Sequence, residues 1–292
     1  MILFIIIALL MFFSFIGCYR DNKDYDFSHN IIFADSCTKQ ICLIWDIDNN
    51  GELSSQELSL VNPTDLKYAF QGKLISSFDE LIFFSGLNYI PSYCFFYNTK
   101  LESITIPSSA QSLGTCCFSG CVNLTSITIP SSVTTIGMYC FSGCTELVSI
   151  NLPNSITTLG SGSFYGCKNL KSIIIPNSVI SIDGCFRGCT NLKEVILPSS
   201  LTTLAMYSFS QCSSLESITI PESVISIEQY SFDECNSLKR VNFSGSSPFE
   251  LDFESIFPSV DTICVPKGAK ELYISSWNIR DDIIIIESDP LI

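Results

Sequence analysis

The stretch LTSITIPSSVTTIGMYCFSGCTE at residues 124–146 is followed by LVSINLPNSITTLGSGSFYGCKN at 147–169 and by LKSIIIPNSVISIDGCFRGCTN at 170–191. The three units carry the same residue types at the same positions, and the series continues on both sides. Its leading leucines are 22 or 23 residues apart, at Leu101, Leu124, Leu147, Leu170, Leu192, Leu215 and Leu238. A repeat at this period predicts stacked structural units rather than one compact core.

Each unit begins with a pattern typical of a short strand. Ile127 and Ile129 alternate with Thr128, and Pro130 ends the run because proline cannot donate to a strand ladder. A second apolar pair and a turn of small residues follow. One unit buries too few side chains to offset the entropy of ordering its backbone, so successive units must stack. The sequence therefore predicts a strand-dominated α/β solenoid with a parallel sheet along one face.

The repeat pattern L-x-x-I-x-I-P-x-S-V-x-x-I…F-x-G-C closely resembles the BspA-like leucine-rich repeats, which occur on the surfaces of bacteria and some protists. The flanks extend this resemblance. Residues 31–90 resemble the N-terminal cap, and residues 260–287 the C-terminal closing segment, of such proteins from Bacteroidetes-type bacteria. The resemblance implies a leucine-rich-repeat solenoid that takes part in adhesion or protein binding.

The charge balance excludes several classes of partner. The chain carries 15 Lys and Arg against 29 Asp and Glu, a net charge of −14, and has no basic run. This argues against binding to nucleic acid and against docking on an anionic membrane by charge. The chain has a single histidine, His29. Ser-His or Cys-His catalysis, or a zinc site with several histidines, would have to use that residue or do without one. We therefore expect no enzyme.

The N-terminus is typical of an export signal. Residues 2–16 are apolar except for Ser14, a run that suits a signal-peptide core better than a membrane span. Gly17 and Cys18 follow and resemble a bacterial lipobox, which predicts a lipid-anchored Cys18 as the membrane attachment. An ordinary secretory signal and a retained membrane anchor are the alternatives. In each case the chain leaves the cytosol, and we expect it at the cell surface or outer membrane.

An acidic loop at residues 46–57 meets the full EF-hand template D-x-[DN]-x-[DN]-G-x5-E. Such a loop holds calcium through oxygen atoms at its positions 1, 3, 5, 7, 9 and 12. The predicted ligands are Asp46, Asp48, Asn50, the carbonyl of Glu52, Ser54 and bidentate Glu57. We expect a structural Ca²⁺ that stabilises the cap. An acidic turn without metal, and a signalling switch, are the alternatives.

These features divide the chain into five predicted segments. They are a signal peptide at 1–17, a polar tether at 18–30, a helical cap with the EF-hand-like loop at 31–90, the 23-residue repeats at 91–243 and a C-terminal cap at 244–292.

Most of the 15 cysteines occupy two repeat columns. One column runs from Cys121 to Cys235, and the other alternates between cysteine and serine, which indicates a need for a small side chain in a crowded turn. Parallel Cβ vectors on stacked coils give poor disulfide geometry. We therefore expect buried free thiols, with Cys37 and Cys42 as the best candidates for a bonded pair.

The outward strand positions are mostly serine and threonine, and two neighbouring isoleucines break this pattern. Ile174 and Ile196 are predicted to lie exposed beside Lys171 and Lys193. Single apolar residues on a surface are ordinary. A contact patch with an apolar centre and a basic rim is the sharper hypothesis. These four residues are the candidate partner-binding site.

The sequence as a whole predicts a cell-surface protein that binds other proteins or extracellular matrix. The alternative is a structural or envelope-assembly lipoprotein of the bacterial surface.

Overall fold

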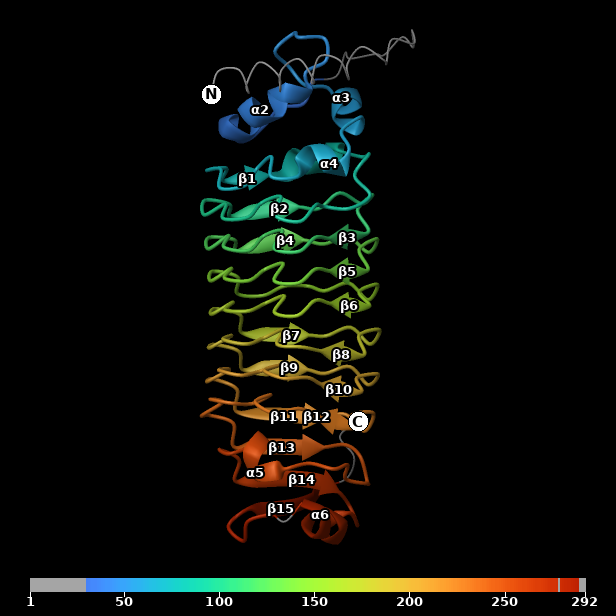
Figure 1. Ribbon diagram of the computed structural model, residues 1–292, viewed down its shortest axis with the longest axis vertical. Coiled ribbons are helices and arrows are strands. Elements are labelled where there is room, and N and C mark those ends of the chain that lie inside the picture. Colours follow the sequence, from blue (N-terminus) through green and yellow to red (C-terminus); the bar gives the residue numbers. More distant parts are fainter. Residues whose placement is uncertain (1–29, 278, 289–292) are drawn as a thin grey trace, which may run out of the picture.

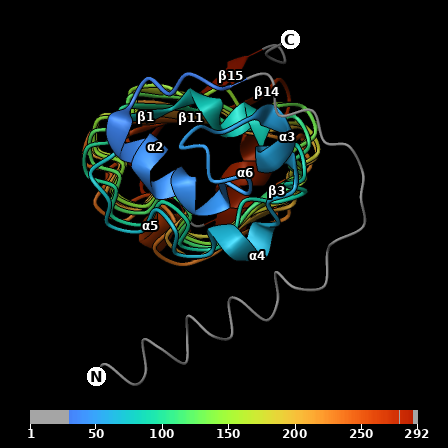
Figure 2. The ribbon, with the colours of Figure 1, turned by 90° about the horizontal axis from the view of Figure 1, so that it is seen from above.

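The computed structural model describes residues 30–277 and 279–288. Figure 1 shows successive coils stacked along the long axis, with short helices at the N-terminal end and a mixed segment at the C-terminal end. Seen along that axis in Figure 2, the coils follow nearly the same outline. The predicted solenoid is confirmed.

The first apolar run forms the predicted parallel strands in most repeats, whereas residues 147–153, the first run of the repeat that begins at Leu147, form no strand. Ser103 lies opposite Ser126, so the strand register equals one repeat. The row is not continuous but consists of three sheets, ordered β1-β2-β4, β7-β9 and β11-β13-β14-β15. Their strands are β1 (Ser77–Phe78), β2 (Ser103–Thr105), β4 (Ser126–Thr128), β7 (Ser172–Ile174), β9 (Glu194–Ile196), β11 (Ser217–Ile220), β13 (Arg240–Phe243), β14 (Thr262–Pro266) and β15 (Ile284–Ser288).

The second apolar pair of each repeat forms another row of strands, which the sequence analysis did not assign. Two apolar residues are too short a run for periodicity to identify a strand. The row consists of two sheets, ordered β3-β5-β6 and β12-β10-β8. Its strands are β3 (Ser112–Leu113), β5 (Thr135–Ile136), β6 (Thr158–Leu159), β8 (Ser181–Ile182), β10 (Thr203–Leu204) and β12 (Ser226–Ile227).

A column of phenylalanines fills the interior. The rings of Phe95 and Phe118 stack with centroids 5.1 Å apart, and the stack continues coil by coil to Phe232 at spacings up to 5.6 Å. The leading leucines are buried beside them. Each coil therefore buries its apolar side chains mainly against its two neighbours.

The repeat cysteines are buried free thiols, as the sequence predicts. The Cys144 thiol donates to the carbonyl oxygen of Phe118 at 3.2 Å, and the other members of its column make the equivalent bond. All the cysteines that the structure describes are free, including Cys37 and Cys42. The candidate bond between that pair is thus not present, and Cys37 is exposed while Cys42 is buried.

Short helices cover the N-terminal end of the core. Trp45 packs edge-on against Phe84 with centroids 5.7 Å apart. Because β1 pairs with β2, the segment predicted as a cap already contains the first coil. The helical elements are α2 (Ser36–Cys42), the 3-10 helix η1 (Leu43–Trp45), α3 (Ser55–Ser59), α4 (Pro63–Leu66) and the 3-10 helix η2 (Asp79–Phe83).

The C-terminal end is closed by α5 (Phe253–Ile256), α6 (Lys270–Trp277) and the last strands. The Trp277 indole donates to the Phe249 carbonyl at 2.7 Å, and the Tyr273 hydroxyl donates to the Gly245 carbonyl at 2.7 Å. These bonds fix α6 against the loop that follows β13.

Candidate functional sites

The acidic loop lies between two helical segments of the cap. η1 ends just before Asp46, and α3 carries Glu57. Asn49 and Gly51 have φ angles of 58° and 81°, in the left-handed region. Such backbone turns the chain sharply, which folds the start of the loop back toward its end.

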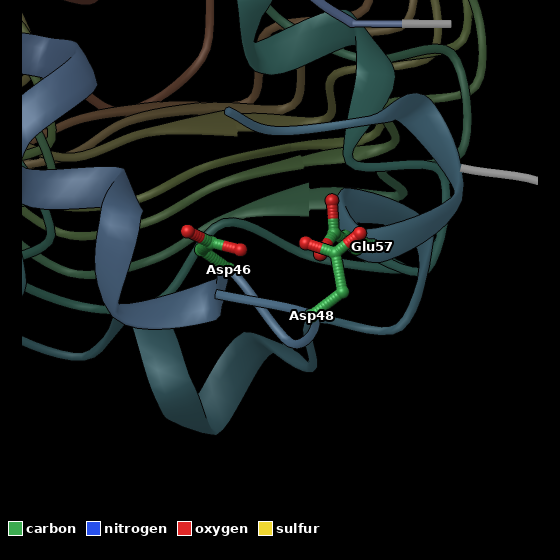
Figure 3. A group of neighbouring side chains, drawn as sticks. All are labelled: Asp46, Asp48 and Glu57. Atoms are coloured by element: carbon green, nitrogen blue, oxygen red, sulfur yellow. The ribbon is translucent and has the colours of Figure 1, made fainter. Parts of the chain in front are cut away.

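Three of the predicted calcium ligands come together. Carboxylate oxygens of Asp46, Asp48 and Glu57 all lie within 4.8 Å of one another (Figure 3). Asp46 Oδ2 accepts from the Gly51 N–H at 2.8 Å, and Glu57 Oε1 accepts from the Ile47 N–H at 2.8 Å. A carboxylate oxygen that accepts one bond retains a second lone pair. This set of hard oxygen donors fits a Ca²⁺ ion.

The remaining predicted ligands have other partners. Asn50 Oδ1 accepts from the Glu52 N–H at 2.7 Å. The Glu52 side chain forms an ion pair with Lys39 at 2.7 Å, while its carbonyl was the predicted ligand. The Ser54 hydroxyl donates to Glu57 Oε2 at 2.9 Å and accepts from the Glu57 N–H at 3.2 Å.

Ser54 and Glu57 thus form a capping box at the start of α3. The sequence analysis missed this role, although Ser54-Ser55-Gln56-Glu57 has the S-x-x-E spacing that signals it. Glu57 therefore does two things: it starts the helix and presents a buried carboxylate to the loop.

The candidate interaction face lies on β7 and β9. Ile174 and Ile196 are direct register partners across these strands. Their side chains are 64% and 58% exposed, so the predicted exposure is confirmed. Lys171 and Lys193 lie just before the same strands, and the Lys193 N–H donates to the Lys171 carbonyl at 2.9 Å. The structure thus brings all four predicted residues onto two adjacent coils.

A shallow hollow borders this face, and the sequence did not predict it. β9 and β11 belong to different sheets, and a space of about 260 Å³ lies where they meet. Lys193, Ile196 and Thr219 are among its lining residues. The alternating apolar positions of the repeat remain apolar through this point, at Val195 and Leu197 and again at Ile218 and Ile220, so no sequence signal marks the break.

Cys18 and the predicted export signal lie outside the described residues. Within residues 30–277 and 279–288, no helix is both long and apolar enough to cross a membrane.

Comparison with known proteins places the repeat in a family. The profile described as "BspA type Leucine rich repeat region" matches in six copies over residues 66–184 and 160–272. The chain belongs to the BspA-type leucine-rich repeat family. No curated protein matches it significantly.

Two solved structures of leucine-rich repeat proteins resemble the chain. One is a leucine rich cell surface protein from Faecalibacterium prausnitzii A2-165, with 32% identity, a TM-score of 0.51 and coverage of 57% of this chain and 45% of that one. The other is a leucine-rich repeat protein from Bacteroides ovatus ATCC 8483, with 25% identity, a TM-score of 0.51 and coverage of 68% and 57%. The chain spans about half the length of these proteins.

Proposed function

We propose that this BspA-type repeat protein is displayed at the cell surface and binds other proteins or matrix components through the face around Ile174 and Ile196. The observation that carries the proposal is the register pairing of these two isoleucines on a surface otherwise rich in serine and threonine. A partner would remove both side chains from water at once, which is favourable in proportion to the apolar area buried.

The surroundings of the isoleucines suit a protein partner. Lys171 and Lys193 provide a basic rim, and among the described residues neither forms an ion pair. The hollow between β9 and β11 can accept a protruding side chain beside Ile196. Because stacked coils hold these positions rigidly, binding would cost little conformational entropy on this side of the interface.

Surface display is supported by the comparison with the F. prausnitzii cell surface protein. We propose that a lipid on Cys18 anchors the chain. Mass spectrometry of the N-terminal peptide from the native protein tests this directly. A peptide that begins with unmodified Cys18, or with any later residue, would contradict the anchor.

We further propose that Asp46, Asp48 and Glu57 bind a structural Ca²⁺. The ion would neutralise three carboxylates that share a small space, and the loop that holds it joins η1 to α3 over the end of the core. Calcium would thereby stabilise the part of the fold that shields the first coil.

The binding proposal is tested by applying the purified protein, in calcium, to an array of matrix proteins, mucins and the organism's own envelope extract. Saturable binding to a matrix protein or mucin is the expected result. Binding to envelope components alone would favour the structural or envelope-assembly role, and binding to none of them would contradict the proposal.

A further inference from the structure

The backbone ladder of the second strand row ends at β12. In the two preceding coils, the carbonyl of the second residue of the strand accepts a hydrogen bond from a backbone N–H of the next coil. Ile182 in β8 accepts from the Ala205 N–H at 2.8 Å, and Leu204 in β10 accepts from the Glu228 N–H at 2.8 Å. The equivalent carbonyl in β12 belongs to Ile227. The following coil has no strand on this side and continues into α5, so no backbone N–H of a described residue extends the ladder.

A pocket of about 400 Å³ lies between this strand end and α5. Its apolar part is formed by Ile227, Leu251 and Ile256, which are each less than a tenth exposed. Met206, on the coil before, contributes a flexible apolar side chain that is 41% exposed. The pocket therefore has an apolar wall.

Three carboxylates line the same pocket. Glu228 Oε2 accepts from the Met206 N–H at 3.0 Å, and Asp252 Oδ1 accepts from the Ser255 N–H at 3.4 Å. Within the described part of the chain, neither these two side chains nor Glu250 has a basic partner, because the ion pairs involve other acids. Negative charge is thus concentrated beside an apolar wall without an internal counter-charge.

The spacing of the carboxylates argues for an organic cation rather than a metal ion. Among the described residues, only Asp46, Asp48 and Glu57 bring their carboxylate oxygens within 4.8 Å of one another. The pocket acids are more widely spread. A lysine or arginine side chain matches this arrangement because its stem is apolar and its charge lies at the far end.

We propose that this pocket binds a lysine or arginine side chain of a partner protein, with the stem against Ile227, Leu251 and Ile256 and the charged end among Glu228, Glu250 and Asp252. The net charge of −14 attracts basic segments to the molecule. The site lies on the second strand row, so it is separate from the Ile174–Ile196 face and does not depend on the function proposed for that face.

Methionine methyl NMR provides a test with an internal control. Met206 lines the pocket, whereas Met138 occupies the same repeat position three coils earlier, away from it. The protein is labelled with ¹³C at its methionine methyl groups and titrated with acetyl-Gly-Gly-Lys-Gly-Gly-amide. We expect a saturable shift of Met206 and none of Met138. The same peptide with norleucine in place of lysine should bind at least fivefold more weakly.

Charge-neutral variants locate the binding group. Glu228→Gln with Glu250→Gln should weaken the lysine peptide at least fivefold, because glutamine keeps the size and hydrogen-bonding oxygen but loses the charge. Glu102→Gln with Glu146→Gln makes the same change in net charge elsewhere and should leave affinity unaltered. Absence of a Met206 shift, equal shifts with norleucine, or equal weakening by both double variants would overturn the proposal. A Met206 shift that saturates with CaCl₂ but not with the peptide would assign the pocket to a metal ion instead.

Discussion

The thiol of Cys144 donates to the carbonyl oxygen of Phe118 on the preceding coil, over 3.2 Å. The same bond links Cys167 to Phe141 at 3.1 Å and recurs along the column. The cysteines are therefore donors that tie one coil to the next, in addition to being small side chains. Since the bond needs the S–H hydrogen, it exists only while the thiol is protonated.

This arrangement predicts instability at alkaline pH. Burial raises the pKa of Cys121, Cys167 and Cys235 from about 9 to about 12. The unfolded thiols lose protons near pH 9 while the folded ones keep them, so stability is full below pH 9 and falls as pH rises toward 12. Each thiol lowers the free energy of unfolding by about 1.4 kcal/mol per pH unit in this window. Urea unfolding between pH 7.5 and 10.5 measures the slope.

Comparison of Cys167→Ser with the parent protein separates the contribution of one thiol to the pH dependence of stability from the contributions of ionising tyrosines and lysines. The serine variant should show a slope that is shallower by the contribution of one group. Identical slopes above pH 9 would contradict the assignment of the effect to the buried thiols.

Calcium should raise the melting temperature through the cap. At millimolar Ca²⁺ and the affinity of extracellular sites, binding to the folded state adds about 0.6–2 kcal/mol. Glu57→Gln should abolish the increment and also lower stability in chelator, because the buried amide NH2 group of glutamine cannot accept the hydrogen bonds that both Glu57 oxygens accept from the Ile47 N–H and from Ser54. Thermal melts in CaCl₂ and in EDTA measure both quantities. A melting temperature that is indifferent to chelator in the parent protein would remove the calcium proposal.

Replacement of Ile174 and Ile196 by threonine should leave folding intact and abolish partner binding. Both side chains are more than half exposed and threonine is common at outward strand positions, so the change in the free energy of unfolding should stay within about 0.5 kcal/mol. Ile225→Thr is a matched control, since Ile225 is 70% exposed beside the second strand row. Unchanged binding by the double variant would exclude this face.

Gly137→Ala should be costly because the coils approach closely there. A Cβ at Gly137 would lie 2.6 Å from the backbone of Gly114 and Thr115 on the coil before. Overpacking against backbone costs about 3 kcal/mol. Gly143→Ala is the control: its φ is 72°, but its nearest neighbour lies 3.9 Å away, so about 1 kcal/mol is expected from backbone strain alone. Chemical denaturation measures the loss of unfolding free energy in both variants. Equal losses would show that neighbouring coils can move apart to accommodate the added methyl group, which would contradict the prediction.

The repeat made most of the fold predictable, and local interactions account for what was missed. Leu101 to Leu238 set the coil length, and the stacked phenylalanines and buried thiols follow from that spacing. The breaks between sheets were not predictable, because the alternating apolar position of the repeat stays apolar on both sides of a break, as at Val195 and Ile218.

The candidate sites were likewise predictable from the sequence only in part. Asp46, Asp48 and Glu57 meet as their spacing predicts, since a short loop limits where these residues can lie. Ser54 has a helix-capping role because a second motif overlaps the first. The pocket beside Ile227 could not be predicted, because Glu228 and Glu250 are brought together only where a regular coil gives way to α5.

The phenylalanine stack has a consequence for how such a protein can evolve. Each ring from Phe118 to Phe209 contacts the ring before and the ring after at nearly constant spacing. Duplication or deletion of one 23-residue segment of the gene would therefore restore the same contacts across the new junction. The molecule can be lengthened or shortened by whole coils, with its two ends kept, so selection can vary the extent of its surface without redesigning its interior.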